Sequence, residues 1–379
     1  MHGMQPNVSD GGGVPPIVFT SCEMLDAAHE NARMAAAGGS AAGAGEANTA
    51  AKRREVSVGG RRVRTIDMHA HCVIPEALQI MGLTVESHER RGPGISEVGA
   101  RRIAEMDAQG IDVEALSINP FWYRAEKDQA VEVVRINNQR LAEFRGTYPD
   151  RITAFASVTL QFPELAAEQL EHAVKQLGLR GAAVSASCAG VDFSDPKFAP
   201  FWRKCEDLDV VVFIHPSSTP ELHKRLAGNG WLANTIGNPL DTTICLEKLI
   251  FEGTLDRHPK LKLCAAHGGG FVPSYAPRMD HACRVSPDEC DPSIQLKKKP
   301  TEYLRDMYYD TLVFTSEALR HLAAEVGSDR LVIGTDHPIP WAEHPVDHVM
   351  SANALSMADR VAILGTNAAR LLRLDVTAG

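Results

Sequence analysis

The sequence contains no apolar run that approaches the length of a membrane span. Its first residues lack a charged segment followed by an apolar one, so we expect no secretory signal. The longest basic runs, Lys52–Arg54 and Lys297–Lys299, have only three residues, and acidic residues outnumber basic ones by 48 to 39. We therefore expect neither a membrane nor a nucleic acid as the main partner.

Cysteine pairs at close spacing are also absent. The eight cysteines are scattered and form no Cys-x-x-Cys motif. In a chain of 379 residues this pattern favours reduced thiols over a disulfide framework. We therefore expect a cytoplasmic enzyme.

The first part of the chain differs in composition from the rest. Residues 1–62 include Gly11–Gly13 and a stretch rich in glycine and alanine at 35–51, which predicts a poorly ordered accessory extension. Within it, Ile17–Met34 could hold a strand and a short helix. Apolar and polar residues alternate around Gly59-Gly60, which predicts a short hairpin. We expect residues 63–379 to form the catalytic domain.

From residue 64 onward, the chain alternates between strand and helix patterns. Eight such alternations predict a (β/α)8 barrel. The alternative is a doubly wound open sheet, which usually carries a glycine-rich phosphate loop after its first strand, where this chain has His-x-His. Long loops after strands one, five and six (72–99, 216–241, 268–306) would form the active-site face. The predicted strands are 64–68, 113–118, 152–158, 181–185, 210–214, 261–266, 307–311 and 331–334, and the predicted helices are 100–109, 129–147, 164–177, 198–208, 242–255, 317–325 and 359–372.

Polar residues close four of these strands. Strand one ends in His69 and His71, which point to the same side because side chains alternate along a strand. His215, His267 and Asp336 follow strands five, six and eight. A hydrogen-bonded strand end explains any one of them equally well, but not five on one rim. Imidazoles with a carboxylate predict one divalent ion, zinc with manganese as the alternative. Strand four has no lysine to bridge a second ion.

These residues resemble the amidohydrolase superfamily, and more narrowly the branch of α-amino-β-carboxymuconate-ε-semialdehyde decarboxylase. The resemblance covers roughly residues 63–374. Aromatic-acid decarboxylases of the wider family often have Glu at the position of His69, so His69 favours the semialdehyde branch. The motifs that carry the resemblance are Ile66–His71, Glu105–Val113, Ala266–Gly270, Arg278–Asp280, Gly334–Pro338 and Asn367–Arg370.

The resemblance implies a metal-dependent, non-oxidative decarboxylase of an unsaturated or aromatic carboxylic acid. His69, His71, His215 and Asp336 would hold the ion, Asp336 would also act in catalysis, and His267 would activate a metal-bound water. The alternatives are a hydrolase or hydratase on the same metal site, and a barrel without catalytic function.

Substrate contacts are predicted at four positions. By resemblance, Arg278 reaches the substrate carboxylate from a neighbouring subunit, which implies a homodimer or a higher homo-oligomer. Arg90 is a second candidate for the carboxylate, and Trp231 matches an aromatic position of the family's pocket. The family often has Tyr at the position of His337, which is predicted either to support the site or to touch the substrate.

Overall fold

The computed structural model describes residues 53–90, 92–217, 219–341 and 344–375. The sequence predictions for residues 1–52, including the strand and helix expected in Ile17–Met34, lie outside the described residues.

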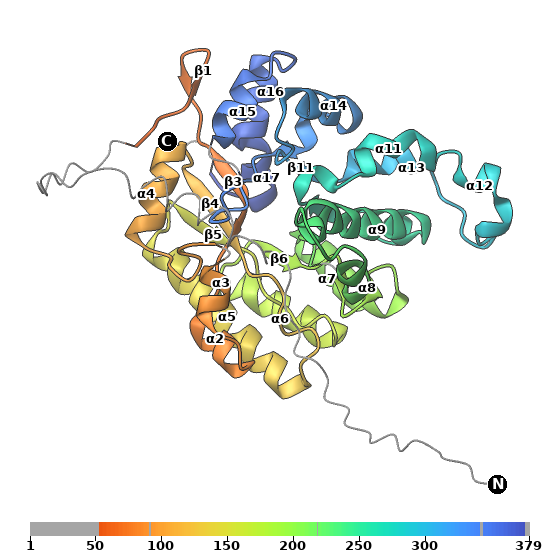
Figure 1. Ribbon diagram of the computed structural model, residues 1–379, viewed down its shortest axis with the longest axis horizontal. Helices are drawn as coiled ribbons and strands as arrows, with labels where there is room; N and C mark the ends of the chain where they lie inside the picture. The colour runs from red at the N-terminus through yellow and green to blue at the C-terminus, as the bar shows by residue number, and fades with distance from the viewer. Residues whose placement is uncertain (1–52, 91, 218, 342–343, 376–379) are drawn as a thin grey trace, which may run out of the picture.

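Eight parallel strands close into a barrel (Figure 1). One sheet has three strands and the other has five, and single bridges join them at both edges, Ala156 to Ala182 and Asp67 to Ile333. The predicted (β/α)8 barrel is therefore confirmed, and the open-sheet alternative is wrong. The barrel strands are β3 (Ile66–His71), β4 (Val113–Ser117), β5 (Ile152–Ala154), β6 (Gly181–Val184), β9 (Val211–Ile214), β10 (Lys262–Ala265), β11 (Tyr308–Asp310) and β12 (Leu331–Val332).

The first barrel strand runs further than predicted. It was expected to end at Met68, but β3 continues through both histidines, and His71 pairs with Ser117 of β4. The ladder forms through backbone groups, so the polarity of His69 and His71 does not end the strand. Other strands are shorter than predicted, because the chain leaves the ladder before its apolar run ends.

The helices cover the outside of the barrel. The helix predicted at 242–255 begins earlier and breaks at Gly253, whose φ is 67°. The helix predicted at 359–372 is interrupted by a π-turn at 362–366, where Gly365 lies against the Arg64 carbonyl too closely for a side chain. The helices are α2 (Pro75–Ile80), α3 (Val85–Glu89), α4 (Ala100–Gln109), α5 (Lys127–Thr147), α6 (Pro163–Lys175), α7 (Ala199–Leu208), α8 (Pro220–Arg225), α9 (Asn238–Phe251), α10 (Thr254–Arg257), α11 (Val272–Met279), α12 (Ala282–Val285), α13 (Pro300–Tyr303), α14 (Ser316–Val326), α15 (Pro345–Ser351), α16 (Met357–Val361) and α17 (Asn367–Leu372).

The barrel interior is filled by side chains and is not a pore. Buried residues such as Met68, Phe155 and Phe213 form one core cluster there, and a larger cluster lies between strands and helices. The ring of His69 lies 5.1 Å from that of Phe213, centroid to centroid. His69, the first predicted metal ligand, therefore packs against the apolar core that fills the barrel.

The predicted hairpin around Gly59-Gly60 is present as β1 (Ser57–Val58) and β2 (Arg61–Arg62). Arg62 donates to the buried carboxylate of Asp112, which also accepts the backbone N–H of Thr65 at 2.8 Å. These bonds attach the hairpin to the start of β3. The domain division at residue 62 stays a prediction.

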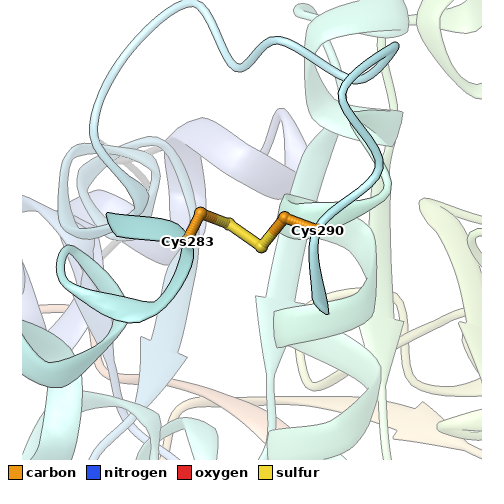
Figure 2. Close-up of a disulfide and its surroundings, with 2 residues drawn as sticks. All are labelled: Cys283 and Cys290. Carbon is orange, nitrogen blue, oxygen red and sulfur yellow. A yellow bond between two sulfur atoms is a disulfide. The ribbon is translucent and has the colours of Figure 1, made fainter. Parts of the chain in front are cut away.

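The expectation that all cysteines are reduced is wrong at one pair. Cys283, within α12, and Cys290, in the segment that follows it, form a disulfide (Figure 2). The two cysteines lie seven residues apart in a long insertion after β10. This spacing matches no short cysteine motif, so the sequence did not indicate the pair. The free cysteines in the described part of the chain, by contrast, are buried: Cys72, Cys188, Cys205, Cys245 and Cys264. Within the described ranges, none of the helices has the length and apolar character needed to cross a membrane.

Candidate metal centre

His69 and His71 present their Nε2 atoms to each other at 3.1 Å. The Nδ1 of His69 lies 2.6 Å from Oδ2 of Asp310, and the Nδ1 of His71 lies 2.9 Å from the hydroxyl of Ser117. That hydroxyl donates to the carbonyl of Ala70, so it accepts from His71. Both imidazoles therefore donate from Nδ1 and turn Nε2, the atom that is left for a metal ion, toward the cluster.

Asp336 lies between these two rings. Its Oδ1 is 2.8 Å from Nε2 of His71 and 3.2 Å from Nε2 of His69. Burial alone would raise the pKa of Asp336, but the charge of His69 and hydrogen bonds to the histidines hold it well below its usual range. The group is thus an ionised carboxylate. Its φ of 63° is uncommon for a non-glycine residue, and such backbone strain is typical of functional sites.

His215 and His267 complete the cluster. Their Nε2 atoms lie 3.9 and 3.8 Å from the carboxylate of Asp336. Both ring nitrogens of His215 and the Nδ1 of His267 are buried without a hydrogen-bond partner. Burial lowers the pKa of His215 well below its usual value, so the ring is neutral, the form that binds metals. Buried polar atoms without partners cost free energy, which a bound cation would recover at His215.

The structure thus brings all five predicted residues together. One ligand atom from each of His69, His215, His267 and Asp336 lies within 4.8 Å of the others, and the His71 ring is 4.5 Å from that of His215. This donor set fits a single divalent ion. Burial alone would lower the pKa of His69, but Asp336 and Asp310 raise it to about 10. A proton and a cation compete for its Nε2, so metal binding releases protons.

Asp310 is a functional residue that the sequence reasoning missed. It is fully buried, and besides the Nδ1 of His69 it accepts the backbone N–H groups of His267 and Gly268, each at 3.0 Å. One carboxylate therefore orients a ligand from β3 and the turn that carries His267. A side chain on Gly334 would come within 2.6 Å of the Cβ of Asp310, so this position requires glycine. The signal was present, since Asp310 is a carboxylate one residue before the end of the strand predicted at 307–311.

Asp67 is a second buried carboxylate that was missed. It accepts the backbone N–H of His69 at 2.9 Å and the hydroxyl of Thr335 at 2.5 Å. Burial, and next the charge of Glu114, raise the pKa of Asp67 to about 7. These bonds join β3 to the segment that leads from β12 to Asp336.

His337 lies behind the metal cluster in a buried charged network. Its Nδ1 is 2.5 Å from Glu114 and its Nε2 is 3.0 Å from Glu105. Arg102 pairs with Glu114 at 2.9 Å and donates to the carbonyl of His71 at 2.7 Å. Burial alone would lower the pKa of His337, but Glu114 raises it. Because both ring nitrogens face carboxylates, the structure favours support of the site over substrate contact for His337.

The other predicted substrate residues lie on surrounding loops and helices. Arg278 is exposed in the last turn of α11. Arg90 is exposed at the end of α3, where its Nε lies 3.4 Å from the carbonyl of Glu86. Trp231, in the loop after β9, stacks on Trp341 with ring centroids 5.2 Å apart. Their substrate contacts stay predictions.

The sequence and the fold were compared with known proteins. The Amidohydrolase family model matches residues 66–374. A 2-amino-3-carboxymuconate-6-semialdehyde decarboxylase of Dictyostelium discoideum is 31% identical over 277 residues, 72% of this chain and 76% of that protein. A gamma-resorcylate decarboxylase of Rhizobium sp. strain MTP-10005 is 31% identical over 327 residues, 82% of this chain and 98% of that one.

A solved structure is similar as well. A dihydroxybenzoic acid decarboxylase from Polaromonas sp. JS666, with bound manganese and the inhibitor 2-nitroresorcinol, superposes with a TM-score of 0.72 at 28% identity, covering 82% of this chain and 97% of that one. The family model spans most of the chain, including every residue of the metal cluster. The chain belongs to the amidohydrolase family.

Proposed function

We propose that this protein is a metal-dependent, non-oxidative decarboxylase of an aromatic or unsaturated carboxylic acid. The observation that carries the proposal is the cluster of four histidines around the Asp336 carboxylate at the C-terminal ends of the barrel strands. Relatives that match most of this chain are named decarboxylases. A divalent ion held by His69, His71, His215 and Asp336 would polarise a substrate oxygen and lower the pKa of a bound water.

The reaction needs a proton at the carbon that loses the carboxylate. The carbon–carbon bond breaks as CO2 leaves, and the electron pair remaining on carbon takes that proton. We assign its delivery to His267, whose side chain is 15% exposed whereas that of His69 is 0% exposed. The backbone N–H of His267 donates to Asp310, which holds the turn that carries the ring, and Nε2 of the ring lies 3.8 Å from Oδ2 of Asp336. Positioned acid–base groups typically contribute about 10²–10⁴-fold to rate.

The proposed substrate class depends on the identity of residue 69, which is His69. The semialdehyde decarboxylase and the gamma-resorcylate decarboxylase are equally similar to this chain, at 31% identity each. His69, where aromatic-acid decarboxylases often have Glu, favours an unsaturated semialdehyde acid over a hydroxybenzoate. The donor set of three imidazoles and one carboxylate favours zinc over manganese, although a related structure contains manganese. Elemental analysis of the purified protein decides between the two.

We infer that the working unit is a homodimer or a higher homo-oligomer, with Arg278 binding the substrate carboxylate of a neighbouring subunit. Helix α11, which bears Arg278, also exposes Phe271 at its start and Tyr275, which is 67% accessible. Figure 1 shows α11 and α12 standing off to one side of the barrel. Within the described residues no carboxylate pairs with Arg278, and an arginine fork matches a carboxylate. We also propose a cytoplasmic location, from the five free thiols buried within the described residues and despite the Cys283–Cys290 disulfide; cell fractionation tests it.

The test is CO2 release from carboxyl-labelled substrates. The panel contains unsaturated semialdehyde acids and hydroxybenzoates, and each reaction is also followed for addition of water. Asp336→Ala should abolish turnover, whereas Asp329→Ala, an exposed aspartate also near β12, serves as the matched control and should not. Hydration or hydrolysis without labelled CO2 on every substrate would replace the decarboxylase with the hydrolase or hydratase alternative.

A further inference from the structure

Residues 281–293, called here the outer segment, have few contacts with the rest of the molecule. They include helix α12, which stands away from the barrel beyond α11 (Figure 1), and none of them is buried. Val285, the large apolar residue of α12, is 70% accessible. Within the described chain, the hydrogen bonds of residues 282–293 all have their partners between residues 281 and 294. The outer segment is therefore ordered by contacts within itself, not by packing against the core.

Two anchors hold the chain on either side of the outer segment. Before it, the carboxylate of Asp280 accepts the backbone N–H and the hydroxyl of Thr301, at 3.0 and 2.8 Å. After it, the backbone N–H of Lys297 donates to Asp256 at 3.0 Å, and Leu296 packs against the larger core cluster. A loss of order in the outer segment should therefore stop at these anchors and leave α11 and α13 in place.

The disulfide between Cys283 and Cys290 closes a small covalent ring inside this segment (Figure 2). Helix α12 has four residues, too few for a helix to persist without outside support, so the ring is its main restraint. Thiol–disulfide exchange requires that an attacking thiolate can reach a sulfur. Cys283 is exposed and Cys290 is half-buried, whereas the five free cysteines of the described residues are buried. The ring is thus open to a redox partner in solution.

We propose that the Cys283–Cys290 pair is a redox switch: exchange with a dithiol opens the ring and releases the outer segment between its two anchors. One thiolate of the dithiol attacks a cysteine sulfur, the S–S bond breaks, and a mixed disulfide forms. The second thiolate then displaces that cysteine. Both cysteines end as thiols and the dithiol ends as a disulfide, so two electrons and two protons pass to the protein. Disulfides of cytosolic proteins are usually transient and redox-sensing. The switch does not depend on the proposed reaction.

The experiment uses the metal-loaded full chain and reduced thioredoxin, a protein dithiol. Labelling with N-ethylmaleimide without denaturant, followed by peptide mapping, should modify Cys283 and Cys290 after reduction and neither before it. Oxidised glutathione should restore the bond. Hydrogen exchange read by mass spectrometry should become about 10–50-fold faster in residues 281–293 on reduction, the upper figure being the loop-closure entropy of so small a ring. Residues 272–280 and 297–306, which the anchors hold, should exchange at unchanged rates.

Two variants control for effects of thioredoxin other than opening the ring. The double variant Cys283→Ser, Cys290→Ser cannot form the bond, so its outer segment should exchange rapidly with or without thioredoxin. Ser286→Ala changes an exposed residue inside the ring and keeps the disulfide, so it should respond as wild type does. A pair that thioredoxin does not reduce, or that does not form the bond again, overturns the exchange site. Hydrogen exchange of residues 281–293 that is unchanged after reduction, in wild type and in the double variant alike, overturns the switch.

Discussion

Asp310→Asn tests whether one buried carboxylate sets the tautomer of the metal site. Oδ2 of Asp310 accepts from His69 and from the His267 N–H, while Oδ1 accepts the N–H groups of Gly268 and Leu312 at 3.0 and 3.1 Å. All of these partners are donors. An asparagine amide has one accepting oxygen, so its NH₂ group must face one of the two pairs.

Each of the two orientations of the asparagine amide has a cost. If the NH₂ group turns toward His69, the imidazole has to accept at Nδ1 and carry its proton on Nε2, where the cation should bind. If the NH₂ group turns the other way, the N–H groups of Gly268 and Leu312 lose their partner, at about 1–3 kcal/mol for each buried donor. Loss of such orienting partners typically weakens metal binding about 10–100-fold, or about 1.4–2.8 kcal/mol.

The assay is equilibrium dialysis against buffered zinc and buffered manganese, followed by elemental analysis of metal per chain. We expect Asp310→Asn to shift half-saturation by about 10–100-fold while the protein remains folded by circular dichroism. Asp306→Asn is the matched control, because Asp306 lies on the surface with a side chain 56% exposed and pairs with Lys298. An Asp310→Asn protein that binds both ions within about twofold of wild type would refute the role assigned to Asp310.

Three further predictions concern His267, Arg278 and Asp112. His267→Ala should keep most of its metal and lose about 10²–10⁴-fold in turnover; a metal-free variant by elemental analysis would instead make His267 primarily a ligand. Mixing inactive His267→Ala and Arg278→Ala proteins under subunit exchange should restore part of the activity if Arg278 serves the partner's site, and no recovery despite demonstrated exchange would contradict that role. Asp112→Asn should lower the free energy of unfolding by about 1–3 kcal/mol at pH 7. Burial alone would raise the pKa of Asp112, but Arg62 and the Thr65 N–H lower it, so the ionised carboxylate stabilises the fold above the unfolded pKa of about 3.9 and does so less as the pH falls below it. In urea unfolding, the difference in free energy of unfolding between wild type and Asp112→Asn should therefore be smaller at pH 3 than at pH 7. An equal difference at both pH values would contradict the assignment.

The barrel and the five central residues were predictable from local patterns. An apolar run followed by a polar residue indicates where a buried strand approaches the rim, and parallel strands bring their C-terminal ends to one rim. His69, His71, His215, His267 and Asp336 could therefore be grouped before any contact was known. The strand ends were less predictable, because pairing follows backbone hydrogen bonds rather than side-chain polarity.

The partners that orient these residues were decided only by the tertiary structure. His69 and Asp310 are 241 residues apart in the chain, and His337 and Glu114 are 223 apart. The stack of Trp231 on Trp341 likewise joins two loops from different strands. A buried carboxylate or indole finds its partner through the closure of the barrel and the packing of loops over its rim, which no short sequence pattern encodes. The sequence alone determined which groups could bind a metal, and the folded chain decided the tautomers, charges and hydrogen bonds with which they would do so.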